Sequence, residues 1–272
     1  MTKEEQKKLQ KKQMEILDEI DKICKKHKIK YSLDAGTLLG AIRHNGFIPW
    51  DDDADILMTR DNYNKFLKIA EKELPENYFI QTPSKEHDYP HTFTKLRLNN
   101  TLLVEKINVG KNFHQGIFVD IFPYDYAGNT LLGAKLKTIY IVSLRTLLLK
   151  KLGYPVKGRS FIQKIVIGFL SIFAKFTNSD KLKRKIEKSL LNNKKKTKYI
   201  ASLTGNSLFN AIMRTSIFDK YTTHKFENKE YSIIKDYDEY LHNLYGDYMT
   251  PPEQKEREIG HGVIKVEFNT KK

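Results

Sequence analysis

Apolar side chains recur at helical spacing near the start of the chain. Leu9, Ile16 and Ile20 are separated by many Lys and Glu residues within the segment 3–27. A period near 3.6 residues is typical of an amphipathic helix that buries one face and exposes the other. We therefore predict a surface helix over residues 3–27.

The next segment predicts a strand, a glycine turn and a second helix. Residues 31–34 are suited to a short strand, and Gly36 begins a turn that opens a helix running through Arg43. The His-Asn-Gly sequence at 44–46 is typical of a helix end, because Asn and Gly tolerate the left-handed conformation found there.

Short runs rich in Phe, Ile, Val, Thr and Tyr predict the rest of a sheet. We expect a strand at 54–58 and then a helix that Asp61 caps and that ends near Lys72. Further strands are expected at 77–81, 92–98, 101–105 and 116–122. Asn99-Asn100 is a good hairpin turn between two of them. Residues 1–125 therefore predict a mixed sheet with flanking helices.

The pattern becomes helical from residue 131 onward. Apolar residues recur at steps of three and four among Lys and Arg, which predicts helices at 131–152, 160–176 and 180–193. Another helix is expected at 231–244, followed by an ordered turn at 245–252 that ends in prolines.

These elements predict an α+β fold in three parts. Residues 1–130 would form the catalytic core together with the N-terminal helix, and residues 131–230 a basic, mainly helical and membrane-facing region. Residues 231–272 would form a helix and a tail that pack back on the core.

Composition narrows the class of protein. The 272 residues can bury a substantial core, and a hydrophobic content of 40% is that of a globular protein. Cys24 is the only cysteine, so an intrachain disulfide is excluded. The charged amino terminus lacks the apolar core of a secretory signal, and the apolar run at 165–173 is shorter than the ~20 residues that span a bilayer. We expect a cytoplasmic protein without a transmembrane helix.

The net charge of +15 is concentrated in one segment. Residues 131–200 contain 18 Lys and Arg against two acidic residues, a net charge of +16, whereas the remainder holds 30 against 31, a net charge of −1. A solvated surface and a nucleic-acid site are alternatives, but no nucleic-acid recognition motif accompanies the charge. Bulky apolar residues at 161–170 beside Lys-rich neighbours favour an anionic membrane surface. We therefore expect peripheral association with the inner face of a membrane and no nucleic-acid partner.

Four aspartates lie close together in the sequence: Asp51, Asp52, Asp53 and Asp55. Carboxylates at this spacing repel each other unless they share a cation, and a hard divalent cation prefers oxygen ligands. In a strand, residues two apart share a face, so Asp53 and Asp55 would present both carboxylates together. Asp51 and Asp52 would either shape the loop or bind the metal through water.

A third carboxylate is expected from Asp120. It stands alone among the apolar residues of the strand predicted at 116–122, and a single acid in so apolar a strand needs a partner. Asp120 would complete a metal site with Asp53 and Asp55.

The glycine segment supplies the other half of a phosphate site. Gly36 and Gly40 would let backbone N–H groups approach an anion where the helix amino terminus favours negative charge. Thr37 would add a hydroxyl contact, although the same residues are also typical of a helix cap. Three cationic side chains are candidates for phosphate or leaving-group contacts, or for surface ion pairs: Arg43, Lys95 and Arg97.

Taken in order, four motifs resemble the LicD-type phosphotransferases, which are relatives of the fukutin-related proteins in the nucleotidyltransferase superfamily. The motifs are GTLLGAIR at 36–43, GFIPWDDDADI at 46–56, GIFVDIFP at 116–123 and YGDYM at 245–249. The resemblance runs from about residue 10 to 125 and returns near 240–255. It implies a nucleotidyltransferase-like core. Thr37 stands where the superfamily usually has Ser.

The resemblance also implies a reaction. A substituted phosphate, phosphocholine or an alditol phosphate, would pass from a CDP-linked donor to a sugar hydroxyl of a cell-surface glycan or its lipid-linked precursor. By position, Asp53, Asp55 and Asp120 would hold Mg²⁺, or Mn²⁺, and Asp120 would accept the proton of the attacking hydroxyl.

Two other functions stay open from the sequence. One is a nucleotidyltransferase that adds a nucleoside monophosphate to a small acceptor. The other is a membrane- or nucleic-acid-binding protein whose aspartates hold a structural cation.

Overall fold

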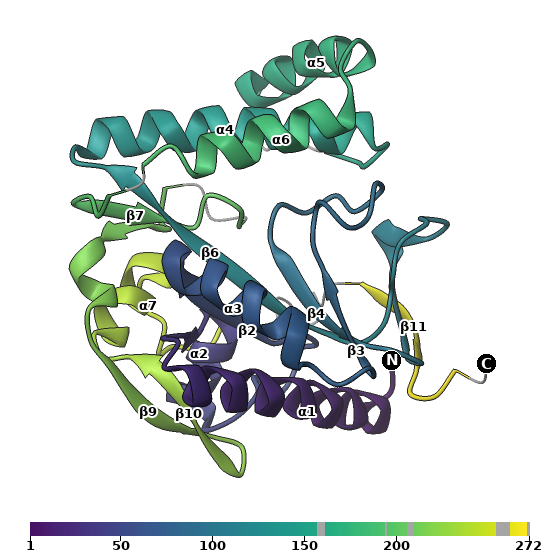
Figure 1. Ribbon diagram of the computed structural model, residues 1–272, viewed down its shortest axis with the longest axis vertical. Helices are drawn as coiled ribbons and strands as arrows, with labels where there is room; N and C mark the ends of the chain where they lie inside the picture. The colour runs from purple at the N-terminus through teal and green to yellow at the C-terminus, as the bar shows by residue number, and fades with distance from the viewer. Residues whose placement is uncertain (157–160, 194, 206–208, 254–261, 271–272) are drawn as a thin grey trace.

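The computed structural model has an α+β fold built on a mixed sheet, as the sequence predicted (Figure 1). It describes every residue except 157–160, 194, 206–208, 254–261 and 271–272. The helices are α1 Lys3–His27, α2 Ala35–His44, α3 Arg60–Glu73, α4 Leu131–Lys151, α5 Phe161–Lys175, α6 Ser179–Leu190 and α7 Tyr237–Tyr245. The strands are β1 Ser32–Leu33, β2 Asp55–Thr59, β3 Tyr78–Gln81, β4 Thr94–Leu98, β5 Leu102–Glu105, β6 Phe118–Gly128, β7 Tyr199–Ala201, β8 Ile212–Arg214, β9 Tyr221–Phe226, β10 Lys229–Ile234 and β11 Val263–Glu267.

Strand β6 is the centre of the sheet. The order is β1-β2-β6-β4-β3, with β2 and β6 parallel and the neighbouring pairs antiparallel. The 11 residues of β6 outrun this sheet, so its last part pairs instead with β7, which pairs with β8. In Figure 1 β6 runs from the sheet to the layer of helices α4, α5 and α6.

Helices α1 and α3 lie together on one face of the sheet (Figure 1). Helix α1 covers the predicted residues 3–27, and Thr2 and Glu5 form a capping box at its start. Its apolar stripe, including Ile16 and Ile20, is fully buried in the main hydrophobic core. The opposite face of the sheet carries the polar residues described below.

The helices after residue 130 form a second, smaller core. Apolar residues of α4 and α6 pack with Ala201 and Leu203 next to the end of β6. The helices predicted at 131–152, 160–176 and 180–193 are all present, with Ser160 outside the described residues. Helix α5 packs against α4 at the outer edge of this layer (Figure 1).

Three local predictions were wrong. The helix predicted from Tyr231 begins only at Tyr237, because Tyr231 and Ile233 alternate inward as part of the β9–β10 hairpin. The residue before α3 is Thr59, and Asp61 lies inside its first turn. Strand β5 does not form the expected hairpin at Asn99-Asn100: its partner in the described residues is β11, near the end of the chain.

In the region predicted as mainly helical, 131–230, the described α-helices end at Leu190, and a short 3₁₀ helix, η2, spans Thr215–Phe218. Strands β7, β8 and β9 also lie within this region, and β7 joins β6 at the main sheet. These strands are short, and two of them have three residues each. Strands of that length leave almost no period-two pattern in the sequence, so they were missed.

Gly40 provides a test of how α2 is packed. A Cβ at Gly40 would lie 2.4 Å from the carbonyl oxygen of Gly46, which belongs to the backbone and has little room to shift. We expect Gly40→Ala to lower the free energy of unfolding by about 2 kcal/mol, since this overlap outweighs the gain in helix propensity of at most ~1 kcal/mol.

Gly168 in α5 is the matched control, because a Cβ there would meet nothing within 4 Å. Gly168→Ala should raise the free energy of unfolding by up to ~1 kcal/mol. Denaturant unfolding of both variants measures the two effects, and equal changes would show that α2 packing is not the cause.

Candidate active site

Two carboxylates and a lysine lie side by side across three strands. Asp55 on β2 pairs directly with Asp120 on β6, and Asp120 pairs directly with Lys95 on β4. Directly paired residues project from the same face of a sheet, with Cβ atoms about 5 Å apart. The parallel register of β2 and β6 thus brings together two carboxylates that are 65 positions apart in the chain.

These groups open into a cavity of about 450 Å³ on the face of the sheet opposite α1 and α3. Its acidic lining residues are Asp34, Asp51, Asp53, Asp55, Glu105 and Asp120. Its aromatic lining residues are Phe93, Phe118, Phe122, Tyr124, Tyr240 and Tyr245. The cavity therefore combines a concentration of negative charge with aromatic walls.

The amino-terminal turn of α2 forms part of the wall. Asp34 precedes this helix, and Ala35 and Gly36 also line the cavity. Ala35 has a φ of 41°, a left-handed conformation that is unfavourable for a residue with a Cβ and is concentrated at functional sites. A Cβ at Gly36 would lie 2.8 Å from a carboxylate oxygen of Asp51, so glycine lets the aspartate loop approach the helix.

Thr37 positions Asp55 from within α2. Its side chain is buried, and its Oγ1 accepts a hydrogen bond of 2.8 Å from the backbone N–H of Asp55. Because Asp55 is the first residue of β2, this bond fixes the point at which the strand enters the site.

The aspartate loop is held from behind by α1. Gln6 donates to the carbonyl of Asp51 (2.9 Å), and Gln13 donates to the carbonyl of Asp52 (2.9 Å). Asp52 itself is buried and is not part of the cavity wall, whereas Asp51 lines it. The amphipathic pattern predicted that α1 buries one face, but it did not predict that Gln6 and Gln13 hold the backbone of the aspartate loop.

Burial and repulsion act together on Asp55. Burial raises its pKa well above the usual value for aspartate, and the neighbouring charges of Asp53, Asp120, Asp34 and Asp51 raise it further. One oxygen of the Asp55 carboxylate, Oδ1, is buried without any hydrogen-bond donor among the described residues. A buried acceptor without a donor is costly and marks a place where a cation would be stabilised.

Asp120 differs from Asp55 because it has a cationic neighbour. The Nζ atom of Lys95 lies 2.7 Å and 2.9 Å from its two carboxylate oxygens. Burial raises the pKa of Asp120, while Lys95 opposes that shift. Lys95 also lies over the ring of Phe118, at 3.4 Å from its centroid, so the ammonium group is held between a carboxylate and an aromatic face.

The set of acids fits a hard divalent cation. Carboxylate oxygens of Asp51, Asp52 and Asp53 lie within 4.8 Å of one another, and this close group in the described residues does not include the predicted ligands Asp55 and Asp120. Asp53 and Asp55 line the same cavity, although Asp53 precedes β2 and lies outside the strand. Several carboxylates with an unmatched buried oxygen form the donor set that Mg²⁺ or Mn²⁺ accepts.

Besides Thr37, which does not line the cavity, three of the predicted contacts lie elsewhere in the described structure. Gly40 packs against Gly46, and Arg43 donates to the carbonyl of Tyr248 (2.6 Å). Arg97 is buried and donates to Gln81 Oε1 and to the carbonyl of Gly116, both at 2.5 Å. None of the three lines the cavity, and Lys95 is the predicted cation that does.

Sequence reasoning placed Asp34 at the end of the strand predicted at 31–34 and missed its place in the cavity wall. The buried hydroxyl of Tyr240 donates to Asp34 Oδ1 and accepts from Tyr124 (2.7 Å between the two oxygens). Burial raises the pKa of Asp34 to about 6, while the bonds from Tyr240 and from the N–H of Ala35 lower it. Tyr240 belongs to α7, so only the folded chain brings it beside β1.

Comparison with known proteins identifies the family to which the chain belongs. Residues 28–140 match the LicD/FKTN/FKRP nucleotidyltransferase domain. The chain is 30% identical over 258 residues to the lipopolysaccharide cholinephosphotransferase LicD of Haemophilus influenzae, covering 91% of this chain and 92% of that protein. An uncharacterized protein of Rickettsia typhi is 40% identical over 55 residues, or 20% of this chain and 18% of its own.

The bond from Asp55 to Thr37 can be tested without an assay of activity. Thr37→Val keeps the shape of the side chain and removes the acceptor, so the buried Asp55 N–H loses its partner. We expect the free energy of unfolding to fall by about 1–2 kcal/mol. Amide hydrogen exchange at Asp55 should become faster, while Thr37→Ser, which keeps the hydroxyl, should leave exchange nearly unchanged. Equal protection in Thr37→Val and the parent would contradict this role.

Proposed function

The chain belongs to the LicD family and is a transferase, and on that premise we propose that it transfers phosphocholine from CDP-choline to a hydroxyl group of a glycan. The glycan would be a cell-surface polysaccharide or its lipid-linked precursor, and an alditol phosphate is the alternative donor group. The observation that carries the proposal is the in-register pair Asp55 and Asp120 in a cavity that the amino-terminal turn of α2 also lines.

The acids would hold a divalent cation, Mg²⁺ or Mn²⁺, and the donor diphosphate would lie beside it. Asp53 and Asp55 are the proposed ligands together with Asp120, and Asp51 is added to them because it lines the cavity. When bound, the cation would neutralise charge on the phosphate oxygens and, as a Lewis acid, polarise the phosphoryl group. The amino-terminal turn of α2 would favour the same negative charge from the other side.

Asp120 is the proposed general base. The acceptor hydroxyl oxygen would form a bond to the phosphorus that carries choline, and the bond from that phosphorus to the bridging oxygen would break, releasing CMP. The hydroxyl proton would pass to Asp120, whose raised pKa suits it to accept a proton near neutral pH. Lys95 would keep its carboxylate oriented through the two contacts described above.

The aromatic walls support choline as the donor group. Phe93 and Phe122 pack together with ring centroids 4.3 Å apart, and Tyr245 lines the same cavity. Aromatic faces attract quaternary ammonium groups, and this attraction strengthens when both groups are shielded from water. An alditol phosphate would gain less from such walls, because it carries no positive charge.

Substitution of the acids tests the reaction. Asp53→Asn and Asp55→Asn should each lower transfer from CDP-choline by about 100-fold or more, because charge at the reacting phosphate is no longer compensated. The assay measures release of CMP with added Mg²⁺. Asp236→Asn, an exposed acid outside the cavity, is the control and should keep full activity. Full activity of both cavity variants would refute the proposal, and release of pyrophosphate would indicate the nucleotidyltransferase alternative.

The variant Asp55→Asn also gives a thermal-unfolding measurement that does not depend on activity. Since the pKa of Asp55 is raised in the folded protein, the metal-free fold loses stability as pH rises from the unfolded-state pKa of aspartate, about 3.9, to that raised value. Asp55→Asn should therefore raise the melting temperature without metal and reduce the further rise on adding Mg²⁺.

Helix α5 supports the proposed position at an anionic membrane. Its large exposed apolar residues fall on one side of the helix, namely Ile165, Val166, Phe169, Ile172 and Phe173, and the exposed Phe176 follows directly after the helix. Within the described residues, none of the helices combines the length and apolarity needed to cross a bilayer. An apolar helix face beside the Lys-rich α6 fits the interface of a membrane that carries negative lipids. Such a position, at the inner face, would bring the cavity near a lipid-linked acceptor.

Two matched isoleucines test the docking of α5. Ile172 in α5 and Ile264 in β11 are 59% and 58% exposed. We expect Ile172→Ser to weaken binding to liposomes of anionic lipid about ten-fold, because an apolar side chain no longer enters the bilayer. Ile264→Ser should have no effect, and binding of the parent should weaken with salt. Equal binding of both variants would exclude α5 as the membrane contact.

A further inference from the structure

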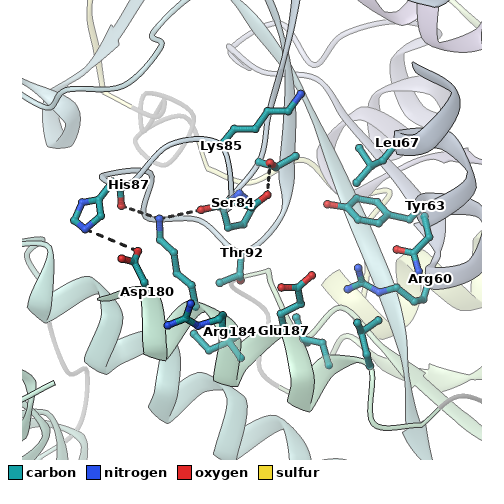
Figure 2. Close-up of a pocket in the computed structure, with 17 residues that line it drawn as sticks. Arg60, Tyr63, Leu67, Ser84, Lys85, His87, Thr92, Asp180, Arg184 and Glu187 are labelled. Carbon is teal, nitrogen blue, oxygen red and sulfur yellow. Dashed lines mark hydrogen bonds and ion pairs between the residues drawn. The ribbon is translucent and has the colours of Figure 1, made fainter. Parts of the chain in front are cut away.

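A second cavity of about 640 Å³ lies between α3, α6 and the loop before β4 (Figure 2). This volume is within the range of small-molecule sites, ~300–1,000 Å³. It shares no lining residue with the cavity of the acids. His91 lines the first cavity and Thr92 the second, so the chain passes from one to the other within two residues.

One polar group in the wall of this cavity has no hydrogen-bond partner in the part of the chain that the structure describes. Thr92 is 8% exposed, and its Oγ1 atom is buried without a hydrogen-bond partner among the described residues. In Figure 2 Thr92 lies in the middle of the lining, between the loop above it and α6 below. As placed, this oxygen has almost no accessible surface, and rotation about χ1 would turn the unmatched hydroxyl, which both donates and accepts, toward a ligand in the cavity.

Most cations around the cavity are already occupied. Lys183 donates to the carbonyls of Pro83, Glu86 and His87 at 3.1, 2.9 and 2.7 Å. Arg60 is held by both carboxylate oxygens of Asp125, at 2.7 and 2.8 Å. Lys183 and Arg60 therefore form part of the cavity walls. Protein carbonyls disperse the charge of Lys183, and the carboxylate of Asp125 balances the charge of Arg60 without any ligand.

Two charged side chains of opposite sign are left for a ligand. Arg184 and Glu187 on α6 line the cavity and make no ion pair with any described residue. Glu187 would repel a phosphate, and Arg184 would repel a quaternary amine. A neutral ligand rich in hydroxyls fits both, since its hydroxyls can donate to the carboxylate and accept from the guanidinium.

The remaining lining suits the ring of a sugar. Leu67 and Ile186 supply apolar surface, while Asn64 and Ser84 add amide and hydroxyl groups. Apolar surface with a few polar groups is typical of sites that bind the C–H faces of a ligand and orient it through hydrogen bonds.

We propose that this second cavity is a saccharide-binding site, with Thr92, Arg184 and Glu187 as its polar contacts. It lies apart from the acids, so it would hold a sugar other than the one whose hydroxyl reacts. The proposal concerns binding alone and stands whether or not the chain transfers phosphocholine.

Saturation-transfer NMR on the full chain tests the site. The probes are methyl β-D-galactopyranoside and methyl β-D-glucopyranoside at millimolar concentration, and at least one should receive saturation from the protein. Thr92→Val should weaken that binding about five-fold, the effect of one lost hydrogen bond. The melting temperature should stay the same or rise, because the hydroxyl has no partner in the free protein. Glu187→Gln should also weaken binding.

Matched controls separate the site from general effects on the protein. Thr222→Val on β9 and Glu239→Gln on α7 change exposed residues outside the cavity and should leave saccharide binding unchanged. The proposal is wrong if neither glycoside receives saturation from the parent, or if the controls weaken binding as much as the cavity variants. Binding of inorganic phosphate at this cavity in place of the glycosides would also overturn it.

Discussion

The direct pairing of Asp55 with Asp120 on parallel strands is the constraint on which the rest of the structure depends. Two carboxylates buried next to each other repel strongly, because little water remains to screen them. The sheet balances only one of them: Lys95, on the strand beyond, contacts Asp120. Asp55 keeps a buried oxygen without a donor, so the fold stores unfavourable electrostatic energy that a bound cation would relieve.

The surrounding elements hold the backbone against this repulsion. Thr37 fixes the N–H of Asp55 from α2, and glutamines of α1 hold the carbonyls of the aspartate loop. The left-handed φ of Ala35 is a further local strain at the same point. A site assembled this way is held rigid, because neighbouring helices anchor the backbone of Asp55 and of the aspartate loop.

Strand β6 explains why two cavities coexist without shared residues. Successive residues of a strand point to opposite faces, so Asp120 contributes to the cavity of acids while Asp125 bonds to Arg60 at the second cavity. The strand also continues past the main sheet to pair with β7 beside the second core. One element thus connects the acids, the second cavity and the helical layer that ends in the exposed apolar face of α5.

The sequence by itself determined the elements whose patterns are long and local: α1, the three helices after residue 130, and the strands that carry Asp55 and Asp120. The spacing of the acids also predicted a shared cation, because such carboxylates repel each other, and this stays a prediction. Only the tertiary structure decided which residues share the site. A hydrogen bond from Tyr240 holds Asp34 in the site, whereas hydrogen bonds to Gln81 and Gly116 hold Arg97 outside it. The physical reason is that strand register and the return of the C-terminal segments bring together residues far apart in the chain, and local periodicity carries no information about such contacts.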